Sequence, residues 1–230
     1  MADIVDGIFP EQTIHLVAGS TGAGKSRWLL EWLSDWQQGK PVIDGRQSNP
    51  VPWLYVSGDR SEKEATATIV DLGLNAKTIP LLPAFGVMPP IGALGVLDMA
   101  EKRDVGLLVW EGFGQYVESN AGSSKVKSWL NMIVWRLSRT EHGKLRTRPL
   151  TIIGVMEQPK MKPRDKYSNA RQRISGPAAW GHTASTIVMV EHALPTCKGP
   201  MRNLEIYPHH GGSEIILKAS LASGHFTIIP

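Results

Sequence analysis

The sequence predicts an α/β fold, in which a mostly parallel central sheet carries helices on both faces. Apolar runs of strand length alternate with segments of helical periodicity over residues 13–190. Continuous apolar strands are buried on both faces, which is typical of a parallel sheet covered by helices. After residue 200, short apolar runs between glycine-containing turns predict antiparallel strands. At 230 residues, the chain has the size of one such domain.

Each expected strand is an apolar run bounded by polar residues, glycine or proline. In the parallel part we expect strands at residues 13–18, 53–57, 105–111, 150–156 and 186–190. The antiparallel strands are expected near residues 204–207, 214–217 and 226–229. Two segments predict loops because they are rich in proline and other turn residues, namely 41–51 and 78–90.

The expected helices fill the intervals at residues 27–38, before residue 72, and at residues 91–102 and 123–141. The last of them has an apolar stripe made of Val126, Leu130, Ile133, Val134 and Leu137. In the first, Trp28, Trp32 and Trp36 are four residues apart and share one face. We expect this face to pack in the core or at a subunit interface, in preference to stacking on bases.

A phosphate-binding motif lies between the first expected strand and the first expected helix. Residues 19–26 match the P-loop pattern G-x-x-x-x-G-K-[ST]. Glycines let the loop point successive N–H groups at a polyphosphate, Lys25 is expected to reach the β- and γ-phosphates, and Ser26 to ligate Mg²⁺. A glycine-rich turn beside a lysine explains this order less well. The expected ATP-binding residues are Gly19, Ser20, Thr21, Gly22, Ala23, Gly24, Lys25, Ser26 and Arg27.

Two acids follow expected strands at positions where a nucleotide hydrolase needs them. Glu111 follows the apolar residues 107–110, and we expect it to hold Mg²⁺, partly through water. Asp59 follows the strand 53–57, and we expect it to orient or deprotonate the attacking water. A helix cap remains the alternative for Asp59, because residues 57–61 are also placed to cap the next helix.

The positive charge of the chain is concentrated in one segment. The formal net charge is +4, whereas residues 159–173 alone hold six cations against one acid. A basic loop beside a nucleotide site is a candidate for contacts with a nucleic-acid backbone, and Tyr167 adds a ring for base stacking. The expected DNA-binding residues are Lys160, Lys162, Arg164, Lys166, Tyr167, Arg171 and Arg173.

Composition indicates a cytoplasmic protein. The N-terminus lacks a signal peptide, and no apolar run has the length of a transmembrane helix, so we expect no membrane association. The single cysteine, Cys197, excludes an internal disulfide and fits a reducing compartment.

In the order and spacing of these segments, the chain resembles the RecA-type ATPase core. The segments that carry the resemblance are 6–19, the P-loop, 54–59, 107–111 and 155–162. The resemblance is nearest to RepA-like plasmid helicases and to the minimal RecA-core recombination ATPases of bacteriophages, which promote single-strand annealing. For a phage gene, the expected compartment is the host cytoplasm. It implies one RecA-like domain over residues 1–230, with a core at about 7–191 and a C-terminal β extension at 192–230.

The resemblance also implies roles for individual positions. Asp59 falls where the family has its catalytic glutamate, and Glu111 where it has the Walker B aspartate, so both acids depart from the family pattern. Gln158 corresponds to a polar sensor of the γ-phosphate. Residues 159–175 correspond to the mobile DNA-binding loop. With Lys25, these make the expected catalytic set Lys25, Asp59, Glu111 and Gln158.

The function implied is a DNA-dependent ATPase that binds single-stranded DNA and assembles on it as a ring or filament in recombination or replication. A single-strand-binding protein is a further expected partner. One alternative is a RepA-like hexameric replicative helicase. Such helicases insert a Lys or Arg pair into the neighbour's ATP site, and this chain offers only Lys198, Arg202 or Lys218 in its place. Another alternative, which the substituted acids favour, is a nucleotide-binding switch or scaffold without hydrolysis.

Overall fold

The computed structural model describes residues 3–43, 45–86, 91–116, 123–157, 179–193, 199–208, 213–222 and 225–229. The strands with parallel partners are β3 (Ile14–Gly19), β4 (Trp53–Ser57), β5 (Leu81–Pro83), β6 (Leu107–Trp110), β7 (Thr151–Glu157) and β8 (Thr186–His192). The antiparallel strands of the same sheet are β9 (Met201–Pro208), β10 (Ile215–Ala222) and β11 (His225–Ile229). A separate two-stranded sheet pairs β1 (Asp3–Val5) with β2 (Phe9–Pro10).

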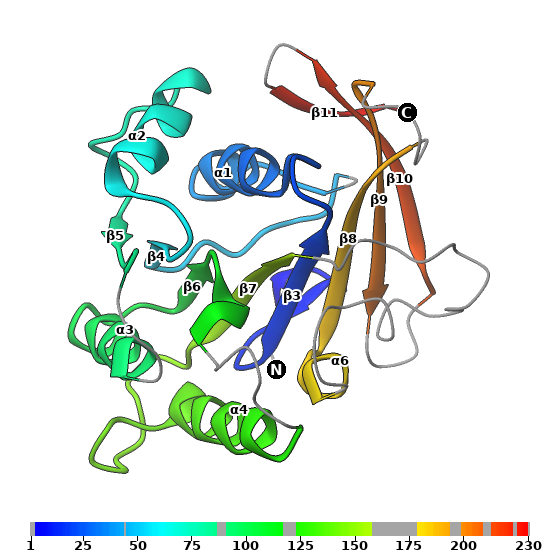
Figure 1. The fold of residues 1–230 in the computed structure, drawn as a ribbon. Coiled ribbons are helices and arrows are strands. Elements are labelled where there is room, and N and C mark those ends of the chain that lie inside the picture. Colours follow the sequence, from blue (N-terminus) through cyan, green and yellow to red (C-terminus); the bar gives the residue numbers. More distant parts are fainter. Residues whose placement is uncertain are drawn as a thin grey trace.

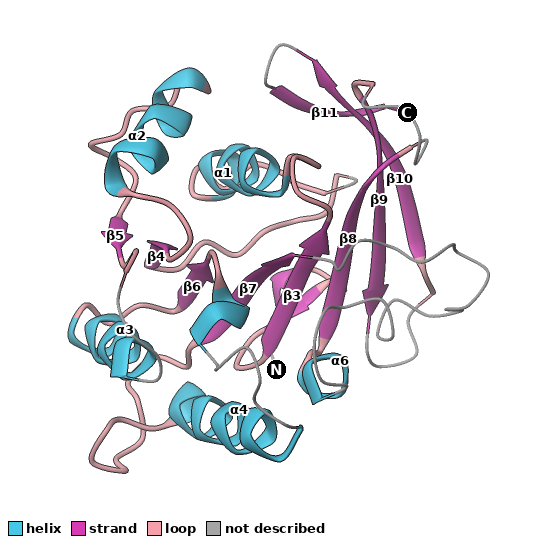
Figure 2. Cartoon of the chain, in the orientation of Figure 1, coloured by secondary structure: helices cyan, strands magenta, loops and turns pink. Residues whose placement is uncertain are grey.

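The helices are α1 (Lys25–Trp36), α2 (Glu62–Asp71), α3 (Ile91–Lys102), α4 (Ser123–Ser138) and α6 (Ala179–Thr183), with a 3₁₀ turn η1 (Phe113–Tyr116). The main sheet has nine strands in the order β11-β10-β9-β8-β3-β7-β6-β4-β5. Helices α1 and α2 cover one face, and α3, α4 and α6 cover the other (Figures 1 and 2). This arrangement confirms the predicted fold class.

The two faces of the sheet belong to two separate hydrophobic clusters. Successive residues of a strand point to opposite faces, so Leu16 and Ala18 of β3 join the cluster beneath α3 and α4, whereas Val17 joins the cluster beneath α1. The strands of the parallel part are mostly apolar because both of these faces are covered.

The tryptophan face of α1 lies in the core, as one of the two predicted alternatives requires. Trp28, Trp32 and Trp36 are all buried. Their rings stack in series, with centroids 6.4 Å apart for Trp28 and Trp32 and 6.0 Å apart for Trp32 and Trp36. This packing orients α1, and therefore the loop that precedes it, against the sheet.

Two short elements differ from the expectations. Residues 81–83 were expected in a loop but form β5, which pairs with β4 alone at the edge of the sheet. An edge strand tolerates Pro83 because only one side of it has a partner, and this proline hid the strand in the sequence. The small β1–β2 sheet was not predicted. Among the described helices, none has the length and apolar character needed to cross a membrane.

Candidate functional site

The P-loop and three acids, of which Asp59 and Glu111 were predicted, gather where four parallel strands end. The P-loop follows β3, Asp59 follows β4, Glu111 follows β6, and Glu157 is the last residue of β7. Parallel strands that are paired in register finish along the same side of the sheet. We call this side, where the carboxyl ends of the strands lie, the carboxyl edge. Gly19 is accordingly paired with Glu157 across β3 and β7, and the backbone N–H of Glu111 donates to the carbonyl of Val56 at 2.9 Å.

The P-loop has the backbone of an anion-binding site. Gly22 and Gly24 lie in the left-handed region, with φ of 77° and 97°, a conformation that glycine adopts without strain. Gly24 is also the N-cap of α1, and it provides no side-chain cap. The N–H groups of a first helical turn have no acceptor within the helix, and the helix dipole is positive there. This end of α1 therefore suits phosphate.

The side chain of Lys25 is half-buried and folds back onto the P-loop. Its Nζ donates to the backbone carbonyls of Gly19 at 2.9 Å and Ser20 at 3.1 Å. Burial lowers the pKa of Lys25, and the carboxylates of Glu157, Asp59 and Glu111 act in the opposite direction. The Lys25 ammonium thus interacts electrostatically with all three carboxylates.

Glu111 is a fully buried carboxylate, with 0% of its surface exposed. Both of its oxygens accept from Nη2 of Arg60, at 2.7 and 2.5 Å. The loop that carries Arg60 comes this close because residue 58 is glycine: a Cβ there would overlap the backbone carbonyl oxygen of Glu111. In this arrangement Arg60 pairs with the acid that the sequence assigns to magnesium.

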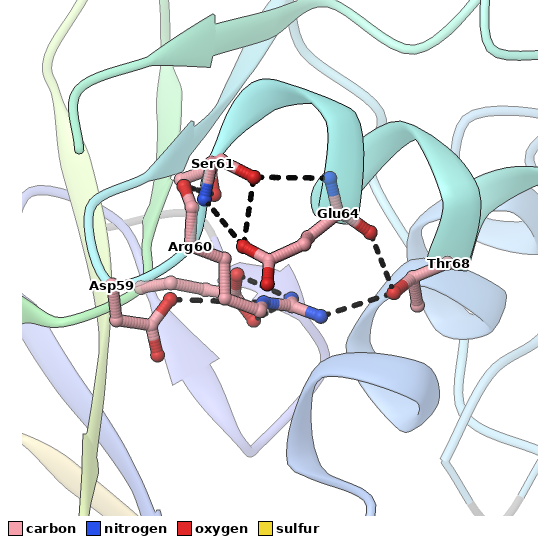
Figure 3. A network of polar contacts seen from close by, with 7 residues as sticks. Asp59, Arg60, Ser61, Glu64 and Thr68 are labelled. Carbon is pink, nitrogen blue, oxygen red and sulfur yellow. Dashed lines mark hydrogen bonds and ion pairs between the residues drawn. The ribbon is translucent and has the colours of Figure 1, made fainter.

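Asp59 is not the cap of α2. Ser61 is the N-cap, and it forms a capping box with Glu64, in which the side chain of each residue accepts from the other's backbone N–H (Figure 3). Burial raises the pKa of Asp59 to about 6; the charge of Glu111 adds to this effect and that of Arg60 opposes it. A carboxylate of this pKa is suited to accepting a proton near neutral pH.

Comparison with known proteins assigns the chain to a family. A family model described as an AAA domain matches residues 1–144. The chain belongs to the AAA domain family. We found no curated protein that matches it. The structure is similar to that of a KaiC-like protein from the hyperthermophilic archaeon Pyrococcus horikoshii OT3, with a TM-score of 0.65 and 14% sequence identity over 99% of this chain and 94% of that one.

These matches confirm the coarser part of the predicted resemblance: the AAA domain is a RecA-type P-loop ATPase domain. The narrower likeness to RepA-like helicases and to phage annealing ATPases is not confirmed. Gln158 and all seven of the predicted DNA-binding residues lie outside the described residues. Arg27, expected at the nucleotide, forms an ion pair with Asp71 at 3.5 Å.

Sequence reasoning missed Glu157 and Arg60. Strand β7 ends one residue later than predicted, so Glu157 lies beside the P-loop, where it accepts from Thr21 Oγ1 at 2.9 Å. The signal available in the sequence was that an acid, Glu157, directly precedes the proposed sensor Gln158. For Arg60, the signal was a cation placed directly between Asp59 and the helix cap Ser61.

Arg202 corrects another expectation about this AAA domain. We considered it as a finger for a neighbouring subunit, but its guanidinium is buried and directed to its own P-loop. Nε donates to the carbonyl of Ala23 at 2.8 Å, and Nη1 donates to the carbonyls of Gly199 and Met201. Of the other two candidates, Lys218 is exposed on β10, and Lys198 lies outside the described residues.

The site residues fit a nucleoside triphosphate with magnesium. The uncapped N-terminus of α1 and Lys25 provide donors for phosphate oxygens. Magnesium prefers a few oxygen ligands together with phosphates, and Ser26 and Glu111 are the residues that would hold it. Within the described ranges, no three His, Cys, Asp or Glu side chains are grouped to hold a metal by themselves.

We expect Arg202→Met to lower the free energy of unfolding by about 1–3 kcal/mol, because buried carbonyl groups lose their donor. Thermal unfolding monitored by circular dichroism measures this. The matched control is Lys218→Met on the neighbouring strand, which should change stability by no more than about 0.5 kcal/mol since Lys218 is exposed. Equal effects of the two substitutions would show that the Ala23 contact contributes nothing to the fold.

Proposed function

We propose that this chain is a DNA-dependent ATPase that binds single-stranded DNA and assembles on it as a homo-oligomer in recombination or replication. The observation that carries the proposal is the position of Glu157. This residue accepts from Thr21 in the P-loop, and the chain continues from it into the basic segment 159–173. Only a short stretch of sequence therefore separates the acid that contacts the P-loop from the predicted DNA-binding residues.

For hydrolysis, we propose separate roles for the charged groups at the carboxyl edge. Lys25 and the first turn of α1 bind the phosphates, and Asp59 accepts the proton of the attacking water. Ser26 and Glu111 hold magnesium, which when bound neutralises charge on the phosphate oxygens. The raised pKa of Asp59 supports its role, because a base is most effective when its pKa lies near the working pH.

The proposed coupling to DNA rests on Glu157 and the proposed sensor Gln158 being consecutive residues. A γ-phosphate that contacts the end of β7 favours one arrangement of the segment after it. DNA that binds this same arrangement then favours ATP binding to the same degree, since coupling between two sites is reciprocal.

A replicative helicase is the second candidate, and the contacts of Arg202 weigh against it. A ring helicase needs a cation from each subunit in its neighbour's site, and such a finger is worth about 10³–10⁵ in rate. Arg202 is held by its own P-loop, which leaves Lys218 as the exposed candidate among the described residues. We therefore propose slow turnover and annealing of strands in preference to processive unwinding.

The proposed base can be tested by mutation and pH. We expect Asp59→Asn to retain nucleotide binding and to lower kcat by about 10²–10⁴-fold, because the base is lost. The wild-type rate should rise with pH around the Asp59 pKa of about 6, since only the ionised carboxylate accepts a proton. Steady-state assays from pH 5 to 8 measure both. Glu62→Gln, at the exposed first position of α2, is the control and should retain activity; the reverse result would make Glu62 the base.

The role of the basic segment can be tested through salt dependence. We expect neutralisation of Lys160, Lys162, Arg164 and Lys166 to weaken binding to single-stranded DNA of any sequence and to abolish stimulation of the ATPase by DNA. Each lost phosphate contact should reduce the slope of log affinity against log salt by about 0.7. Neutralising four exposed lysines elsewhere, Lys63, Lys77, Lys127 and Lys144, changes net charge equally and should leave the slope intact. An unaltered slope in both sets would place DNA elsewhere.

The helicase alternative can be separated from annealing in one pair of assays. Forked-duplex displacement and complementary-strand annealing are run with the wild type, and with Lys25→Ala as the nucleotide-binding control. We expect annealing and little displacement. Robust ATP-dependent displacement that is lost in Lys218→Met would identify Lys218 as the finger and establish the helicase.

A further inference from the structure

Arg60 holds both predicted catalytic carboxylates with one guanidinium group. Its Nη2 donates to the two oxygens of Glu111, and its Nε lies 3.7 Å from Oδ1 of Asp59. On its other side, Nη1 donates to Oγ1 of Thr68 in α2 at 3.1 Å. Figure 3 shows the side chain of Arg60 lying between Asp59 and this helix. The positive charge is thus fixed beside both acids.

This pairing affects any metal that Glu111 binds. A buried carboxylate requires a positive partner, and Glu111, which is fully buried, has one in Arg60. The negative charge that attracts a divalent cation is the charge that Arg60 already neutralises. While Arg60 stays in place, the pair has no net charge and both oxygens of Glu111 accept hydrogen bonds, so its attraction for a second cation is weak.

We infer that Arg60 competes with magnesium for Glu111 and thereby sets the magnesium concentration at which the nucleotide site fills. The inference rests on the proposed function, because it takes Glu111 as the acid for magnesium. It adds that Glu111 has two alternative partners. Arg60 has to release Glu111 before the acid serves a metal, and Thr68 and Asp59 remain within reach of the released guanidinium. Magnesium and nucleotide consequently assist each other's binding less than at a site whose acid is unpaired.

The test is the magnesium dependence of nucleotide binding, measured by isothermal titration calorimetry with ADP and with a non-hydrolysable ATP analogue. The coupling factor is the ratio of the Kd in EDTA to the Kd in saturating Mg²⁺. We expect Arg60→Gln to raise this factor at least about tenfold over the wild type, because no cation then competes for Glu111. Arg60→Lys keeps the charge but loses the planar fork of donors, and it should give an intermediate factor.

Two controls assign the effect to the pair. In a Glu111→Gln background, Arg60→Gln should change the coupling factor less than about twofold, because the contested carboxylate is gone. Arg148 forms a longer and more exposed ion pair with Asp104, at 3.6 Å, before β7 and so at the amino-terminal ends of the strands. Arg148→Gln should leave the factor unchanged. Equal factors in the wild type and Arg60→Gln would overturn the inference, as would an Arg60 effect that persists without Glu111.

A second measurement needs no nucleotide. Thermal unfolding is compared in MgCl₂ and in NaCl of equal ionic strength. We expect MgCl₂ to raise the Tm of Arg60→Gln and not that of the wild type, since the ion replaces the missing partner of Glu111. If Arg60→Gln does not fold, Arg60→Lys takes its place in the calorimetry, where the intermediate coupling factor is the expected result and a factor equal to that of the wild type overturns the inference. A wild type that binds nucleotide no better than Lys25→Ala contradicts the proposed function. Normal wild-type binding and turnover without any Arg60 effect contradict the inference alone.

Discussion

The carboxyl edge, at which β3, β7, β6 and β4 end, is the constraint on which the site depends. These strands are mostly apolar on both faces, so they pair in parallel between two layers of helices, and their carboxyl ends coincide. Every proposed catalytic group among the described residues follows one of these ends by a few residues. The site is therefore assembled by the packing of the sheet, and the loops need only short, specific turns, as at Gly58, to bring the side chains together.

Charge at this edge is balanced within the chain. Asp59, Glu111 and Glu157 would repel one another in a partly buried site, and Lys25 and Arg60 offset that repulsion. Burying such ion pairs stabilises a fold little compared with apolar packing. Their presence at the mouth of a P-loop is thus better explained by chemistry than by stability, and the shifted pKa of Asp59 is one consequence.

The sequence predicted the parts of the molecule that have local signals. The P-loop pattern located the phosphate site, and strand-length apolar runs located most of the sheet, because burial on both faces leaves a continuous signal. The sequence did not predict which side chains contact one another. The pairing of Arg60 with Glu111 joins residues 51 positions apart, and the contact of Arg202 with Ala23 joins residues 179 positions apart. Such contacts are set by the order of strands in the sheet, which periodicity does not reveal. For the same reason, the sequence left Arg202 among three candidate fingers for a neighbouring subunit, whereas it contacts its own P-loop.

Strands that follow the matched region also contact the P-loop. Residues 1–144, which match the AAA domain, include the P-loop, Asp59 and Glu111 but neither β7 nor β9. From β7 comes Glu157, which contacts Thr21, and from β9 comes Arg202, which holds the carbonyl of Ala23. A buried guanidinium beside a phosphate-binding loop adds positive charge where a polyphosphate needs it, and fixing the Ala23 carbonyl fixes the neighbouring N–H groups as well. The P-loop is therefore contacted by two strands that come after the matched region, so its conformation depends on residues outside that region.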